Sequence, residues 1–154
     1  FNFARAIGVS IAMIAIRQKR PIKIVGFNSC IESELDLSEA VLSEAPKAVL
    51  AFAASLSCFG GTDFEEVMQC SRRFNDDHDG RADLVIITDG ESSLEESREG
   101  DPRIFTVLIG EASASGHALT DRSESFAHIA DTGSPRDVSI GLITFSKALD
   151  EGVQ

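Results

Sequence analysis

Residues Leu84 to Thr88 form a short apolar run that leads directly into an acid and a glycine, Asp89-Gly90. A run of this length without alternation is typical of a parallel strand that is buried on both faces. Such a strand needs helices on either side of its sheet, so the run constrains the chain to an α/β architecture. It also predicts that the Asp89 carboxylate lies at the carboxyl edge of the sheet, where ligands bind in folds of this class.

The rest of the chain predicts alternating helices and strands. Hydrophobic periodicity, Pro21 and Pro46 predict helices at Phe3–Ile16, Pro46 to about Cys58, Thr62 through Phe74, and Ser123–Ala130. Apolar or alternating runs predict strands at Ile22–Phe27, Ile31–Leu37, Leu84–Thr88 and Arg103–Ile109. The end of the chain is left open: Val138–Ile143 could be a final strand, and Ser146–Leu149 could be a helical tail.

This order of elements predicts an α/β fold with an open, mostly parallel sheet and helices on both faces. We expect the interior strands to be Ile22–Phe27, Leu84–Thr88 and Phe105–Ile109. The strand Ile31–Leu37 alternates apolar and polar residues, so we expect it at a half-exposed edge.

Length and charge narrow the possible functions. The chain has 154 residues, enough for one domain, with 25 acidic against 14 basic residues and a formal net charge of −11. This balance argues against nucleic-acid binding, and the cluster Arg17–Arg20 fits the last turn of a helix instead. Three cysteines without a C-x-x-C spacing favour a reducing compartment such as the cytoplasm. No apolar run approaches the ~18 residues that a membrane span requires.

Two oxygen-bearing side chains stand out as candidate metal ligands. Thr62 follows two glycines at the expected start of a helix, and Asp89 follows the apolar strand. A hydroxyl and a carboxylate are the hard donors that Mg²⁺ prefers. Each also has a plain alternative. Thr62 and Glu65 fit a capping box, and Asp89-Gly90 fits a simple turn.

Other sequence patterns fall short of a known chemistry. The loop Asn75–Gly80 begins like an EF-hand, but its twelfth position, which should be a glutamate, is Ile86, so a helix-to-strand turn is the better interpretation. The chain has no G-x-S-x-G, G-x-G-x-x-G or P-loop motif, so neither a nucleophilic serine nor a nucleotide site is indicated.

Several of these runs together resemble a known family. The stretches Gly60–Phe64 and Leu84–Glu91 resemble the second and third parts of the metal-ion-dependent adhesion site (MIDAS) of von Willebrand factor A (VWA) domains. Within that superfamily, four stretches resemble the bacterial VWA proteins that partner MoxR-type AAA+ ATPases, the ViaA and CoxE relatives: Pro46–Leu50, Phe59–Phe64, Ala82–Glu91 and Arg103–Gly110. The resemblance implies a single VWA-like, Rossmann-like domain over residues 1–154, with Thr62 and Asp89 as ligands of Mg²⁺.

The first part of the MIDAS, an Asp-x-Ser-x-Ser loop after an N-terminal strand, has no counterpart in these residues. We therefore expect the first strand and the first metal-site loop to precede Phe1. The resemblance further implies a non-enzymatic, metal-dependent protein-binding module of the bacterial cytoplasm. It would serve as an adaptor or co-chaperone of a MoxR-type ATPase, with a partner's acidic side chain completing the metal site. Two alternatives stay open: a VWA-like interaction domain without metal, and a metal-assisted hydrolase that uses Asp89.

Overall fold

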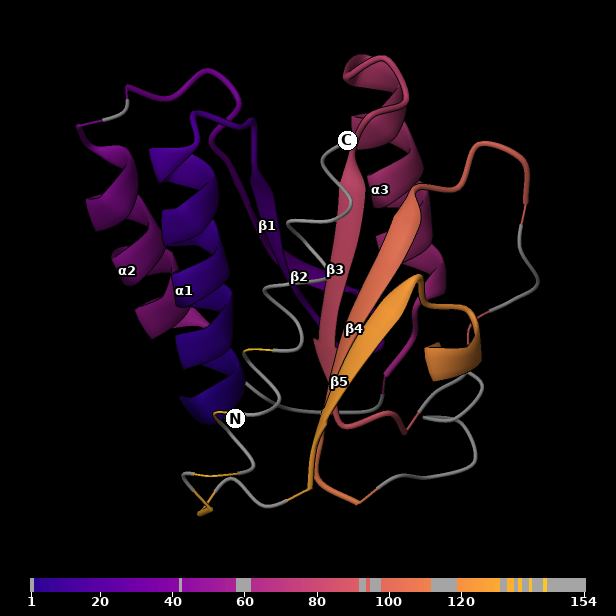
Figure 1. The fold of residues 1–154 in the computed structure, drawn as a ribbon. Coiled ribbons are helices and arrows are strands. Elements are labelled where there is room, and N and C mark those ends of the chain that lie inside the picture. The colour runs from indigo at the N-terminus through magenta and orange to yellow at the C-terminus, as the bar shows by residue number, and fades with distance from the viewer. Residues whose placement is uncertain are drawn as a thin grey trace. The chain divides into compact units, whose positions relative to one another are not determined.

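The computed structural model describes residues 2–41, 43–57, 62–91, 94, 98–111, 119–130, 133, 134, 136, 139 and 143. The elements in chain order are α1 (Asn2–Arg17), β1 (Lys23–Phe27), β2 (Ile31–Asp36), α2 (Ala45–Ser55), α3 (Glu65–Asp77), β3 (Asp83–Thr88), β4 (Arg103–Ile109) and β5 (Ser125–Ile129) (Figure 1). The chain divides into two compact units, Phe1–Val67 and Met68–Gln154, with the boundary inside α3. The predicted mixed α/β class is confirmed.

In the first unit, β1 and β2 form an antiparallel pair that runs from Lys23 opposite Asp36 to Phe27 opposite Ile31. The residues of β2 alternate between half-buried and exposed, as the alternating sequence predicts. All five residues of β1 are only partly buried. The hairpin is therefore a thin layer that depends on its helices for cover.

The helices α1 and α2 pack side by side in this unit (Figure 1). Their buried positions are Ile7 and Ala12 on α1, and Ala45 and Val49 on α2. The Arg5 guanidinium donates a hydrogen bond to the carbonyl of Leu56, just after α2. A Cβ atom at Gly26 in β1 would lie 2.3 Å from Leu56 Cδ2, so glycine lets this leucine approach the strand.

The end of α1 is a Schellman motif. The Arg20 amide donates to the Ala15 carbonyl and the Lys19 amide to the Ile16 carbonyl, both at 3.0 Å. Lys19 takes the left-handed conformation that this motif requires, with φ 55°. The predicted stop before Pro21 is confirmed, and the basic cluster lies at the end of a helix.

In the second unit, β3, β4 and β5 form a parallel sheet in that order. The interior strand β4 is buried at five consecutive positions, Ile104 to Leu108. Thr106 is the one polar residue among these five, and its hydroxyl lies 2.6 Å from the hydroxyl of Ser123, which donates in turn to the Leu119 carbonyl. The buried Thr106 hydroxyl is therefore hydrogen-bonded within the core of this unit.

Two predictions near the end of the chain need correction. Ser123–Ala130 was expected to be a helix, but residues 125–129 form the strand β5, parallel to β4. Its side chains alternate, with Ala127 and Ile129 buried and Phe126 and His128 exposed, so the period is two. The possible strand at Val138–Ile143 lies largely outside the described residues, and the possible helical tail at Ser146–Leu149 lies wholly outside them. Of these ranges only Ser139 and Ile143 are described, and both are helical.

The expected single sheet is also corrected. The described strands form two sheets, an antiparallel pair β1-β2 and a parallel trio β3-β4-β5. The prediction of an interior position is confirmed for β4, whereas β1 and β3 each lie at the end of their own strand order. The pairing of β1 has a local cause. A short turn folds β2 back on β1 as an antiparallel hairpin, whereas parallel pairing would need a longer crossover connection.

No helix in the described part of the chain has the length and the apolar character needed to cross a membrane.

Candidate functional site

Asp89 directly follows β3, and the loop after the strand exposes its carboxylate. The Thr88 hydroxyl is buried at the strand end and accepts a hydrogen bond from the Gly90 amide at 3.1 Å. Asp89 Oδ1 accepts the Glu91 amide at 3.4 Å. Gly90 has φ 76°, a conformation that favours glycine. The Asp-Gly pair therefore builds a turn that holds the carboxylate at the carboxyl end of the strand.

The other two strands of this sheet end at the same edge. The register places Thr88 beside Leu108 and Leu108 beside His128. His128 Nε2 lies 2.7 Å from the Gly110 carbonyl, and the Gly110 amide donates to the Ile129 carbonyl at 3.0 Å. Sequence reasoning found only scattered histidines, because the parallel register that brings His128 to this edge is not visible in the spacing.

The segment around Thr62 lies at the carboxyl end of β1 in the first unit. The Asp63 amide donates to the Asn28 carbonyl at 2.8 Å. The rings of Phe27 and Phe64 have centroids 5.5 Å apart, and this aromatic contact holds the segment beside Phe27, the last residue of β1. Thr62 itself is partly exposed.

The prediction of a capping box at Thr62 is wrong. The helix α3 begins at Glu65, and the side chain that accepts the Glu65 amide is Asp63, at 2.9 Å from Oδ1. The helix start therefore uses the carboxylate two residues before the first helical residue. Glu65, the expected partner of Thr62, donates its backbone amide to the Asp63 carboxylate. The carboxylate of the next residue, Glu66, accepts the Ile31 amide at 2.8 Å.

The two predicted ligands thus lie in different units, each beside the carboxyl end of a strand of its own unit. Thr62 belongs to the first unit and Asp89 to the second. A metal site that joins them stays a prediction. The donor chemistry fits Mg²⁺, since both groups offer oxygen. Among the residues that the structure describes, no group of three or more His, Cys, Asp or Glu side chains is placed to hold a metal ion.

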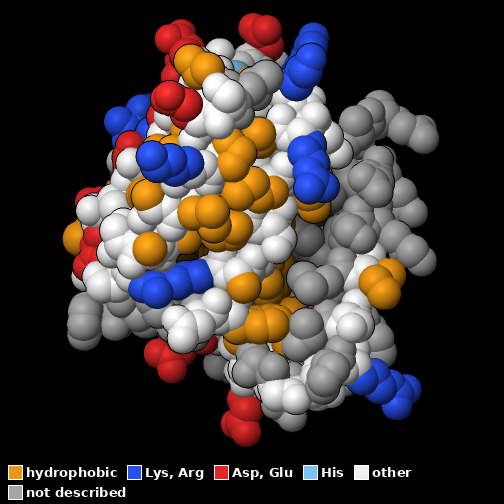
Figure 2. Space-filling view, turned by 90° about the vertical axis from the view of Figure 1, so that its left-hand side faces the viewer, with side chains coloured by type: hydrophobic (Ala, Val, Ile, Leu, Met, Phe, Trp, Pro, Cys, Tyr) orange, Lys and Arg blue, Asp and Glu red, His pale blue; other side chains and the backbone are white. Residues whose placement is uncertain are grey.

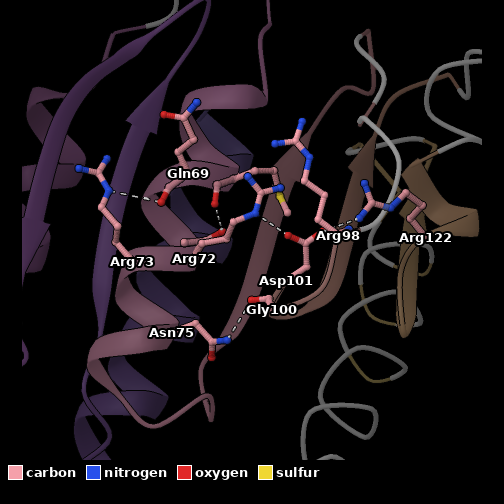
Figure 3. Close-up of polar contacts among 10 residues, drawn as sticks. Gln69, Arg72, Arg73, Asn75, Arg98, Gly100, Asp101 and Arg122 are labelled. Carbon is pink, nitrogen blue, oxygen red and sulfur yellow. Dashed lines mark hydrogen bonds and ion pairs between the residues drawn. The ribbon is translucent and has the colours of Figure 1, made fainter.

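A separate polar cluster lies at the opposite edge of the parallel sheet (Figure 3). Asp101, two residues before β4, accepts Arg72 Nε at 2.6 Å, the Arg98 amide at 2.9 Å and Arg122 Nη2 at 3.2 Å. Only 6% of the Asp101 side chain is exposed. Burial alone would raise the pKa of this carboxyl, but the Arg98 amide and the guanidinium groups of Arg72 and Arg122 outweigh it, so its pKa lies below the ordinary value.

Asn75 near the end of α3 extends this cluster (Figure 3). Its amide donates to the Gly100 carbonyl at 3.3 Å, and its side-chain oxygen accepts the Ala82 amide at 2.9 Å. The turn after α3 closes with the Gly80 amide on the Asn75 carbonyl at 2.8 Å. The predicted helix-to-strand turn is confirmed, since α3 ends at Asp77 and β3 begins at Asp83. Sequence reasoning missed the Asp101 cluster, because its members are far apart in the chain.

Comparison of the chain with models of known protein families, with curated proteins and with solved structures gives no match.

Proposed function

We propose that this chain is a VWA-like, non-enzymatic protein-binding module that holds Mg²⁺ with Thr62 and Asp89. The observation that carries the proposal is the position of Asp89. Its exposed carboxylate directly follows a strand of a parallel sheet, on a turn built by Thr88 and Gly90. A carboxylate at this edge occupies the place where folds of this class bind ligands.

The chemistry of the site explains how it would bind a partner. Asp89 supplies an anionic oxygen and Thr62 a neutral one, and a hard cation held by few protein ligands keeps open positions. In a chain with a formal net charge of −11, that ion is a strong local positive charge. An Asp or Glu side chain of a partner would complete the coordination.

We propose a MoxR-type AAA+ ATPase of the bacterial cytoplasm as the partner, with the chain as its adaptor or co-chaperone. This part rests on the sequence resemblance. The two described cysteines support a reducing compartment, because neither the exposed Cys30 nor the buried Cys70 forms a disulfide.

The test separates ion binding from partner binding. Isothermal titration with Mg²⁺ alone measures the ion, and titration with a nucleotide-free MoxR-type ATPase, with Mg²⁺ or with chelator, measures the partner. The ATPase is used without nucleotide, because Mg²⁺ bound to ATP would add its own contribution to the Mg²⁺ dependence of binding. We expect Asp89→Asn to weaken both titrations at least about tenfold, since a charged oxygen ligand becomes neutral.

The matched control is Asp121→Asn, an exposed aspartate elsewhere in the second unit. It removes the same charge and should leave both titrations unchanged. Equal binding of the ATPase with and without Mg²⁺, together with a silent Asp89→Asn variant, would favour the metal-free interaction domain instead.

A further inference from the structure

The outer face of the helix pair α1–α2 combines exposed apolar side chains with exposed cations. Neither helix contains an acid, and the nearest acid along the chain is the exposed Glu44 at the N-cap of α2. Ile14 on α1 is 45% exposed and Leu50 on α2 is 56% exposed. Figure 2 shows hydrophobic side chains gathered on this side, with Lys and Arg side chains beside them and Asp and Glu side chains toward the margins of the view. We call this surface the α1–α2 face. Its exposed residues are Asn2, Ala6, Ser10, Ile14 and Arg17 on α1, and Lys47, Leu50, Ala51, Ala54 and Ser55 on α2.

The two helices run in opposite directions, so their exposed residues meet. Arg5 near the start of α1 bonds the carbonyl of Leu56 after the end of α2. Ile14 lies about 13 Å along α1 from Arg5, and Leu50 about 9 Å along α2 from Leu56, at the helical rise of about 1.5 Å per residue. The two exposed apolar side chains therefore lie within about one helical turn of each other on neighbouring helices, near Arg17 at the end of α1 and Lys47 at the start of α2.

The remaining surface of the face suits close helix packing. Ala6, Ala51 and Ala54 are small, and the two serines return their hydroxyls to their own helices. Ser10 Oγ donates to the Ala6 carbonyl at 2.8 Å and Ser55 Oγ to the Phe52 carbonyl at 2.7 Å. Covering these serines would therefore leave no hydroxyl unpaired, so an apolar partner surface meets little desolvation cost.

The charge of the face is opposite to that of the chain. Residues 1–31 and 45–57 contain no Asp or Glu, although the chain has 25 acidic residues in all. Arg17 and Lys47 are exposed on the face itself, and Lys19 is exposed just beyond the end of α1. A partner with an apolar stripe flanked by acids would satisfy both the apolar side chains and the cations.

We propose that the α1–α2 face binds an amphipathic helix of a partner protein whose apolar stripe is flanked by Asp and Glu. The helix lies across Ile14 and Leu50 and pairs with Arg17 and Lys47 at one end. An anionic membrane is disfavoured by two properties of the chain: it has no Trp or Tyr, the residues that anchor proteins at lipid interfaces, and its net charge of −11 repels anionic lipid. Neither of the proposed metal ligands is among the residues of this face.

The experiment uses the 154-residue chain and two designed helical peptides of about 20 residues, long enough to hold a helix. Both peptides share one Ala/Leu stripe, and Glu flanks it in one and Lys in the other. Fluorescence anisotropy measures binding at low and at physiological salt. We expect the Glu peptide to bind at least about tenfold more tightly than the Lys peptide, with the preference reduced by salt. Chelator should leave this binding unchanged, which distinguishes it from the metal site.

Variants locate the site. Ile14→Glu and Leu50→Glu should each weaken the Glu peptide at least about tenfold, because they place a charge in the apolar stripe. Val41→Glu is the matched control, since Val41 is 67% exposed and lies outside both helices. For charge, Lys47→Glu should weaken binding, while Arg81→Glu, at an exposed position outside α1 and α2, should not. Circular dichroism checks that each variant is folded.

Three results would overturn the proposal. The first is equal or absent binding of the two peptides, and the second is unchanged binding in both Ile14→Glu and Leu50→Glu. The third is a different occupant: stronger binding to phosphatidylserine vesicles than to the Glu peptide would assign the face to a membrane. Self-association of the chain that Leu50→Glu abolishes would likewise assign it to a second copy.

Discussion

The two units bury their strands in different ways. In the second unit, β4 has a parallel partner on each side and is buried at five consecutive positions. In the first unit, all five residues of β1 are only partly buried, and β2 alternates with exposed residues. A strand with neighbours on both sides forms a core, whereas a hairpin relies on the helices that cover it.

Charge is also arranged differently in the two units. The second unit places Asp101 between Arg72 and Arg122, and it pairs Arg103 with Asp83 at 2.8 Å. The first unit also pairs charges, with Lys23 on β1 against Glu34 on β2 at 2.8 Å, but 41% of the Glu34 side chain is exposed. The ion pairs of Asp101 are more deeply buried, so we expect them to contribute more to stability than the pair in the first unit.

The largest expected effect comes from removing an aromatic ring in each unit. Phe105 is 1% exposed in β4, so Phe105→Ala should lower the free energy of unfolding by about 3–5 kcal/mol. Phe27 in β1 is only partly buried, and Phe27→Ala should cost about half as much or less. Urea denaturation followed by circular dichroism measures both. Equal losses would mean that the two strands are equally important to the fold.

The second prediction concerns the buried acid. Asp101→Asn should lower stability at pH 7 by about 2 kcal/mol, since it weakens charge-assisted hydrogen bonds to two arginines. The pKa of Asp101 is lowered in the folded state, so its contribution is present above the unfolded-state pKa of about 3.9 and is lost as the pH falls through the folded value. The gap between wild type and variant should therefore shrink below about pH 4.

Thermal unfolding from pH 7 down to pH 2 tests this sign. The control is Asp121→Asn, which removes an exposed carboxylate from the same unit. It should stay close to wild type over the whole range. A gap for Asp101→Asn that widens as the pH falls would contradict the assigned role.

The third prediction distinguishes Asp63 from Thr62 at the start of α3. Asp63→Ala removes the acceptor of the Glu65 amide and should cost about 1 kcal/mol. Thr62→Ala should stay within about 0.5 kcal/mol, because Thr62 is not the residue that caps the helix. Urea titration of both variants decides between them. If Thr62→Ala cost more than Asp63→Ala, the capping assignment would have to be reversed.

The smallest effect is expected at the end of α1. Lys19 has φ 55°, so Lys19→Gly should raise stability by about 0.5 kcal/mol by relieving a conformation that side chains disfavour. Arg17→Gly is the matched control, because it lies in the last turn of the helix and should lose up to about 1 kcal/mol. Melting temperatures measured side by side give the sign, and a loss in both variants would count against the Schellman assignment.

Much of the local structure was predictable from the sequence. The apolar periodicity of α1, the alternation of β2 and the apolar runs of β3 and β4 predicted their elements to within about one or two residues. The strand position before Asp89 was predicted for the same reason, because an apolar run followed by Asp-Gly describes a strand and its turn. These features depend on neighbours a few residues away.

Sequence reasoning failed where a distant partner decides the outcome. Residues 125–129 were expected in a helix, but pairing with β4 makes them a strand, and five residues are too few for their own periodicity to decide. The Asp101 cluster joins residues 29 and 21 positions apart through ion pairs that no spacing reveals.

The sequence by itself therefore determined which segments are helices or strands over most of the described chain, and that Asp89 directly follows a strand. Tertiary structure alone decided that this strand lies at the end of its sheet and is only partly buried, and that the described strands form two sheets. It also decided that Asp63 rather than Thr62 caps α3, and that His128 reaches the Gly110 carbonyl. The physical reason is the distance along the sequence over which each interaction acts. Periodicity and turn chemistry act over a few residues, whereas strand pairing and buried ion pairs depend on which distant segments the fold brings together.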